Sequence, residues 1–205
     1  MDAGQIARYA RQIALPEIGP GGQAAICGAR VLIVGSDLAA ETARAYLIAA
    51  GVGAVQRREG PVGDGAAWLD ALGGIDLVVR TDFGALTELG FAQRSRRGRS
   101  KEPSQGSCLI DDEAMLGAAR RLGVPVIVAR AEPERVDLIA FPRRPPDPGA
   151  EIDTRARPAA RHPGGATGPT GVLAGALAAA EALAVLVRDE DASSARGKRH
   201  LRLPV

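Results

Sequence analysis

The chain has 205 residues, of which 46% are hydrophobic and 24% are charged. These proportions suit one folded domain and exclude an intrinsically disordered chain. The formal net charge of +2 is too small for a protein-wide attraction to nucleic acid or to an anionic membrane. Two cysteines and two histidines exclude a disulfide framework and a structural zinc site, so we expect no metal and a reducing, cytoplasmic compartment.

The predicted elements alternate between strands and helices along the chain. A strand over 31–34 precedes a helix over 37–50, which ends at Gly51. The polar run at 56–58 predicts an exposed edge strand. The alternation indicates an α/β fold, Rossmann-like and doubly wound, with a mainly parallel sheet and helices on both faces. The later predicted elements are strands over 75–80, 124–129 and 136–141 and a helix over 111–122.

Three segments are predicted to lie outside the core of a single domain over 1–190. The arginine-rich run 93–107 contains almost no residue to bury and is predicted to be a mobile loop. Such a short run without aromatic residues is typical of a solvated loop, so we expect no nucleic-acid partner. The segment 143–170, rich in proline, glycine and arginine, is a predicted crossover, and 191–205 is a predicted flexible tail.

The last apolar segment, 171–187, is interrupted only by Glu181. It is shorter than the roughly 20 apolar residues that a spanning helix needs, and its charge lies near the middle. We therefore predict a buried or interface helix and no membrane association.

Several motifs occur in one collinear order from Arg8 to Val187. Together they resemble the ubiquitin-activating-enzyme superfamily, whose bacterial members include the ThiF, MoeB and HesA adenylyltransferases. The motifs are Arg8-Tyr9-Ala10-Arg11-Gln12-Ile13, Leu15-Pro16-Glu17-Ile18-Gly19, Val31-Leu32-Ile33-Val34-Gly35, Ala49-Ala50-Gly51-Val52-Gly53, Asp76-Leu77-Val78-Val79 with Thr81-Asp82, Gly123-Val124-Pro125-Val126, and Gly171-Val172-Leu173-Ala174-Gly175 with Glu181-Ala182.

The resemblance implies activation of a carboxylate by magnesium-ATP, with the phosphates bound where the first strand turns into its helix. The family's G-x-G-G-L-G loop is here Gly35-Ser36-Asp37-Leu38-Ala39-Ala40, so most of its glycines are lost. Asp37 also places a negative charge where phosphates would lie. Alternatively, Asp37 or Ser36 caps the helix, which is the ordinary role of such a residue at this position.

The resemblance implies three nucleotide-binding positions in this chain, Gly35, Glu59 and Asp82. Glu59 stands where a carboxylate would hold ribose, and Asp82 matches a magnesium ligand, although a helix cap is the alternative for Asp82. Between Glu59 and Thr81 the chain lacks the family's arginine motif and lysine, so one αβ unit is predicted to be deleted. Cys108 does not match the family's catalytic cysteine and is predicted to be an incidental loop thiol.

In dimeric members of the family, the arginine at the position of Arg11 reaches the partner's ATP. Arg11 could therefore act in trans, or it could anchor the amino-terminal helix through an ion pair. The losses predict a non-catalytic partner subunit, scaffold or regulator of an active adenylyltransferase, without a cofactor. It would form a homo- or heterodimer with a ThiF/MoeB-like subunit or bind a ubiquitin-like carrier protein. The alternative is an active adenylyltransferase that uses magnesium-ATP.

Overall fold

We describe a computed structural model of the chain, which covers residues 1–59, 62–81, 106–132, 135–141, 168–188 and 199–204. Asp82 and most of the predicted loop 93–107 and crossover 143–170 lie outside these residues. The elements in chain order are α1 (Ala3–Arg8), α2 (Ala10–Ile13), α3 (Gly19–Gly28), β1 (Arg30–Val34), α4 (Leu38–Ala50), β2 (Ala54–Arg58), α5 (Gly65–Ala71), β3 (Leu77–Arg80), α6 (Gly106–Leu122), β4 (Val126–Glu132), β5 (Arg135–Phe141), α7 (Pro169–Val187) and β6 (Arg199–Pro204).

The strands form one sheet of six in the order β2-β1-β3-β4-β5-β6. The first four strands are parallel, whereas β5 and β6 run antiparallel to their neighbours. The predicted α/β class with a mainly parallel sheet is confirmed, and β2 is an edge strand as predicted. Among the described residues, α5 is the one helix between β2 and β3, and β1 pairs directly with β3.

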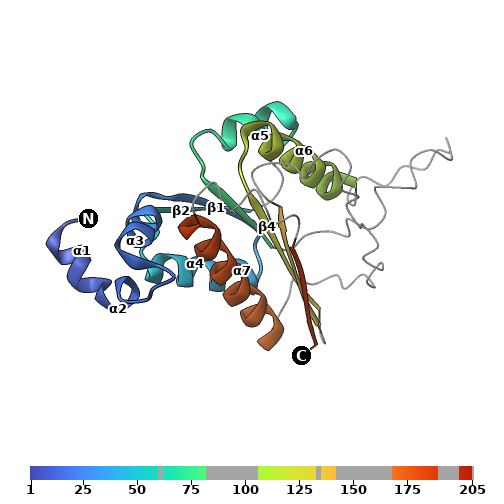
Figure 1. The fold of residues 1–205 in the computed structure, drawn as a ribbon. Coiled ribbons are helices and arrows are strands. Elements are labelled where there is room, and N and C mark those ends of the chain that lie inside the picture. Colours follow the sequence, from blue (N-terminus) through green and yellow to red (C-terminus); the bar gives the residue numbers. More distant parts are fainter. Residues whose placement is uncertain (60–61, 82–105, 133–134, 142–167, 189–198, 205) are drawn as a thin grey trace, which may run out of the picture.

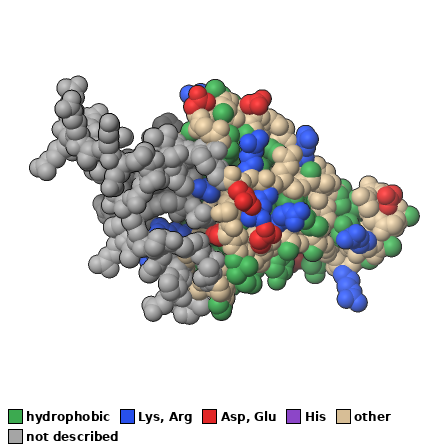
Figure 2. Space-filling model, turned by 180° about the vertical axis from the view of Figure 1, so that it is seen from behind, with side chains coloured by type: hydrophobic (Ala, Val, Ile, Leu, Met, Phe, Trp, Pro, Cys, Tyr) green, Lys and Arg blue, Asp and Glu red, His purple; other side chains and the backbone are tan. Residues whose placement is uncertain are grey.

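Helices cover both faces of this sheet (Figure 1). Alternate residues of the central strands enter opposite cores: Val31 and Ile33 of β1 pack under α4 and α7, whereas Leu32 and Val34 pack under α5 and α6. Period-two alternation of this kind makes both faces apolar, as a parallel sheet between two helical layers requires. On the reverse view, basic and acidic side chains are interspersed over the described surface (Figure 2).

Helix α7 joins the core of the α3–α4 layer. Gly175 lies so close to the backbone of Ala39 on α4 that a β-carbon would overlap the Ala39 carbonyl oxygen and lie 2.7 Å from Thr42 Cβ. By length and composition α7 could cross a membrane, and 39% of its most apolar window is buried in the protein. Its close packing on α4 is that of a core helix in an α/β domain, which is consistent with a soluble protein.

Two boundaries differ from the sequence-based expectation. The predicted tail 191–205 is wrong in part, because Arg199–Pro204 forms β6 and pairs antiparallel with β5. Since β5 would otherwise leave a row of backbone groups unpaired at the sheet edge, a short terminal segment gains hydrogen bonds there. Helix α6 begins at Gly106, before the predicted start, so Cys108 lies within a helix and not in a loop.

Candidate functional site

The candidate site lies at the carboxyl ends of β1 and β3. The chain leaves β1 through α4 toward β2, and returns through α5 to β3 on the other side of β1. The strand order therefore reverses between β1 and β3, which is where open α/β sheets bind ligands. Gly35 follows β1 and Thr81 follows β3 at this point, and both residues are buried.

Asp37 caps α4 and at the same time joins the two strand ends. Its Oδ1 accepts a hydrogen bond from the Ala40 backbone N–H at 2.9 Å and another from the Thr81 hydroxyl at 2.7 Å. The cap that was one of the two sequence-based interpretations of Asp37 is confirmed. A bound phosphate would need the same backbone N–H groups at the positive end of the helix, so the Asp37 carboxylate occupies an anion position.

Gly35 and Thr81 are in close contact at the carboxyl ends of β1 and β3. Gly35 has φ +154°, and a β-carbon there would overlap Thr81 Oγ1. The backbone N–H groups of both residues already have acceptors within the sheet. The Gly35 N–H donates to the Arg58 carbonyl and the Thr81 N–H donates to the Val34 carbonyl, each at 3.0 Å. The glycine that begins the expected phosphate loop thus accommodates the Thr81 side chain.

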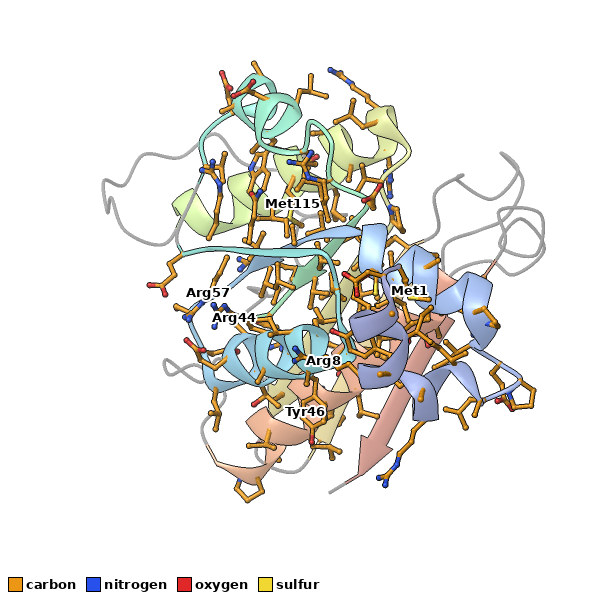
Figure 3. All side chains as sticks on the ribbon, turned by 90° about the vertical axis from the view of Figure 1, so that its left-hand side faces the viewer. Met1, Arg8, Arg44, Tyr46, Arg57 and Met115 are labelled. Carbon is orange, nitrogen blue, oxygen red and sulfur yellow. The ribbon has the colours of Figure 1, made fainter. Side chains whose placement is uncertain are left out.

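Arg57 of β2 connects the edge of the site to Gly35 and two carboxylates. Its Nε donates to the Gly35 carbonyl at 3.0 Å, and its guanidinium pairs with Glu41 of α4 and, at 2.8 Å, with Glu59. Figure 3 shows Arg57 beside the start of α4. Glu59, the predicted ribose ligand, is therefore placed at the site and paired with Arg57. From the sequence, Arg57 was predicted only to be part of an exposed strand. The signal for the cluster is an arginine on one element with glutamates close to it on the same and the neighbouring element.

Arg80 at the end of β3 was missed by sequence reasoning. Its side chain is 6% exposed, and one guanidinium nitrogen donates to the Val34 carbonyl at 3.2 Å and to the Thr81 carbonyl at 2.8 Å. An arginine that ends an otherwise apolar strand is the sequence signal that could have revealed it. Arg80 thus holds the carboxyl ends of β1 and β3 together.

Arg11, the candidate for a role in trans, lies on α2 and is exposed. Its side chain forms no hydrogen bond or ion pair with any residue that the structure describes, so the anchoring ion pair, one of the two interpretations of Arg11, is not found among those residues. The preceding segment is held by Tyr9, whose buried ring lies against Gly51 at the end of α4. No group of three possible metal ligands occurs within the described ranges.

Neither a protein-family profile nor a curated protein matches this sequence. Among solved structures, the fold is similar to the crystal structure of selenomethionine-labelled PaaA, with a TM-score of 0.63 and 11% sequence identity. The similarity covers 100% of this chain and 74% of the PaaA chain. At this identity the likeness supports the α/β fold.

Proposed function

We propose that this chain is a non-catalytic ThiF/MoeB-like protein that acts as the partner subunit, scaffold or regulator of an active adenylyltransferase or of its carrier protein. One observation carries the proposal: Asp37 and Thr81 fill the point between β1 and β3 where the nucleotide phosphates would be bound. The Asp37 carboxylate accepts a hydrogen bond from the Ala40 N–H at the N-terminus of α4, at 2.9 Å, so a phosphate that used this N–H group would have to displace it.

Electrostatics around this point also oppose ATP. Three carboxylates lie near the start of α4, those of Asp37, Glu41 and Glu59, and the described cation between the last two is Arg57. Arg57 is already neutralised by both glutamates. With the buried Arg80 guanidinium at the ends of β1 and β3, the described groups around this point are three carboxylates and two guanidinium groups, so a polyphosphate would meet a net negative charge among the described side chains.

The partner role is supported by Arg11, because its guanidinium is exposed and is not used by the described part of its own chain. An arginine supplied by a neighbouring subunit can raise phosphoryl-transfer rates by about 10³ to 10⁵. Addition of this chain to an intact adenylyltransferase from the same organism should then raise its ATP–pyrophosphate exchange. Arg11→Ala should abolish the increase, whereas Arg120→Ala on α6 should leave it unchanged.

Thermal unfolding with magnesium-ATP tests the closed site directly. A ligand at 100 times its Kd stabilises a protein by about 2.7 kcal/mol, which shifts Tm by several degrees in a domain of this size. We expect no shift at millimolar magnesium-ATP. A magnesium-dependent shift that is lost on Arg57→Ala would contradict the proposal and support an active adenylyltransferase.

A further inference from the structure

Strand β2 is an open edge of the sheet. It stands first in the strand order β2-β1-β3-β4-β5-β6, and β1 is its one partner among the described strands. The next strand along the chain, β3, pairs with the other side of β1. The free side of an edge strand presents unpaired backbone groups that a further strand can bind.

Four backbone groups of β2 face away from the sheet. The Ala54 N–H and the Arg58 carbonyl are hydrogen-bonded on the β1 side, and in a parallel pair such residues alternate with residues whose groups face the opposite way. Val55 and Arg57 therefore each direct an N–H and a carbonyl toward the free side. No described residue forms a hydrogen bond with these four groups.

The side chains of β2 leave this edge open to another strand. Arg57 lies on the α4 face, where it pairs with Glu41 and Glu59 and its side chain is only 18% exposed. Gln56 and Arg58 lie on the opposite face and are exposed. Arg57 is thus held by its own chain, and Gln56, at the centre of the strand, presents an uncharged amide.

A second copy of β2 fits this edge in one antiparallel register. A two-fold axis pairs the same strand of both copies, so the residue at the axis lies opposite itself. With the axis at Gln56, Val55 of each copy lies opposite Arg57 of the other. These are the two residues whose backbone groups face outward, and each such pair exchanges two hydrogen bonds. All four free groups of each copy would then have partners.

The side chains agree with this register. The two Gln56 side chains would lie directly opposite one another, and an amide carries both donors and an acceptor, so the two can hydrogen-bond together. Arg58 would lie opposite the small side chain of Ala54. No charged residue of β2 would have a like charge directly across the pair.

The two neighbouring registers fail. An axis at Arg57 would set two guanidinium groups directly opposite, which destabilises a strand pair. An axis at Val55 would set Arg57 opposite Gly53, whose N–H already donates to the Ile26 carbonyl. The Arg57 carbonyl would then lose its donor. Only the register about Gln56 satisfies both the charges and the backbone groups.

Helix α4 adds a flank to this edge. Glu41 lies on the β2 side of α4, since it pairs with Arg57, and Arg44 and Ile48 follow it by three and seven residues on the same stripe. Figure 3 shows Arg44 and Arg57 on this side of the molecule. About the same axis the two α4 helices would run antiparallel. Each Arg44 would then lie between its own Glu41 and the partner's Glu41, and the 43% exposed Ile48 would be covered.

We infer that β2 is an interface between two copies of this chain, joined antiparallel about Gln56 so that their sheets become continuous. The contact is made by β2 and the flank of α4 and does not use Arg11. A contact of so few residues is small, so the dimer is weak and depends on protein concentration. The inference does not depend on the proposed function, because it follows from the free edge alone.

Gln56→Cys tests the register. Directly opposite residues at such a position have Cα atoms about 4.5 Å apart, which is within the range of a disulfide. Under mild oxidation the introduced thiols should form an intermolecular disulfide at least tenfold faster than those of Arg58→Cys, the matched exposed control. In the control the two thiols are four residues apart along the strands, roughly 13 Å. Peptide mass spectrometry distinguishes this disulfide from bonds of Cys27 and Cys108.

Val55→Pro tests the backbone hydrogen bonds. Proline removes one outward N–H and leaves the bonds to β1 in place. Sedimentation velocity from micromolar to millimolar protein should give a dimer Kd at least tenfold higher than that of Val55→Ala, which loses the valine contacts but keeps the N–H. The two variants should unfold at similar Tm.

Three results would each overturn the inference. They are equal disulfide rates in the two cysteine variants, a dimer that Val55→Pro leaves unchanged, and a chain that stays monomeric at millimolar concentration. The last result together with binding of an extended peptide at β2 would assign the edge to a different chain. None of these measurements involves magnesium-ATP, so failure of this interface is distinguishable from failure of the proposed function.

Discussion

Asp37 and Asp64 cap two helices in the same way, yet their surroundings differ. Asp37 accepts from the Ala40 N–H at the start of α4, and Asp64 accepts from the Ala66 and Ala67 N–H groups at the start of α5. Of the two, only Asp37 also accepts a hydrogen bond from a side-chain hydroxyl, that of Thr81 just after β3, at 2.7 Å. The comparison shows that one local motif can be a simple helix cap at one position and a bridge across the sheet at another.

Their positions in the sheet explain this difference. Asp37 follows β1, whose carboxyl end lies beside that of β3, whereas Asp64 lies in the connection from the edge strand β2. A residue at the reversal of strand order has neighbours from both halves of the sheet, and a residue beyond an edge strand does not. The region around Asp37 is therefore expected to be coupled, and the region around Asp64 to behave as an independent cap.

The largest expected effect is a difference in stability between alanine substitutions of the glycines beside Asp37 and Asp64. Gly35→Ala should lower the free energy of unfolding by about 3 kcal/mol or more, because backbone strain adds to overlap with Thr81 Oγ1. Gly63→Ala, one residue before Asp64, has φ +122° and would meet Ala67 Cβ at an ordinary 3.6 Å. Gly63→Ala should therefore lower the free energy of unfolding only through backbone strain, by about 1–3 kcal/mol. Urea denaturation measures both, and equal losses would contradict the tight fit at Gly35.

The next effect isolates the bridge. Asp64→Ala should lower the free energy of unfolding by about 1 kcal/mol, the ordinary value of an N-cap. Asp37→Ala should cost about 1 kcal/mol more, because the Thr81 hydroxyl then loses its acceptor in a buried position. In a double-mutant cycle, Thr81→Val should couple to Asp37→Ala and be additive with Asp64→Ala. Additivity at both aspartates would show that the 2.7 Å hydrogen bond contributes no net stability.

The smallest effect concerns the ion pairs beside Asp37. In Arg57→Gln the loss of the two ion pairs should lower the free energy of unfolding by about 1 kcal/mol or less at low ionic strength, since both glutamate partners are more than half exposed. The loss of the Nε hydrogen bond to the Gly35 carbonyl adds a part that does not depend on salt. The loss should shrink in 0.5 M salt, where the Debye length is only a few ångström. Arg58→Gln, next to it on the same edge strand, provides the control. An equal and salt-independent loss in both variants would assign the effect to packing of the arginine stem.

Most local elements were predictable because each has a signal within a few residues. The β-branched run at 31–34, the cap at Asp37 and the glycine at 51 specify a strand, a helix start and a helix end, and the structure has all three. The strand at 56–58 was predicted to be an edge strand because its residues are polar, and polar side chains in a strand favour contact with solvent. Strand β6 was missed, since six residues with a weak pattern become a strand only when β5 offers a free edge.

The family resemblance, and not a local pattern, led us to expect Gly35, Glu59 and Asp82 at one nucleotide site with Asp37 beside it. In the structure Gly35, Asp37 and Glu59 follow β1 and β2, and Asp82 lies outside the described residues. The hydrogen bonds from Thr81 to Asp37, from Arg57 to the Gly35 carbonyl and from Arg80 to the Val34 carbonyl join residues that are 22 to 46 positions apart. No local spacing encodes such contacts.

By itself, the sequence determined the alternation of strands and helices, the caps and the apolar character of both faces of the sheet, because hydrophobic periodicity and capping act within one or two turns. The tertiary structure decided that the carboxyl ends of β1 and β3 are joined by Asp37 and Thr81, and which side chains of α4 are buried and which are exposed. Both depend on which strands become neighbours and on which helix covers which, and these are set by packing of the whole chain.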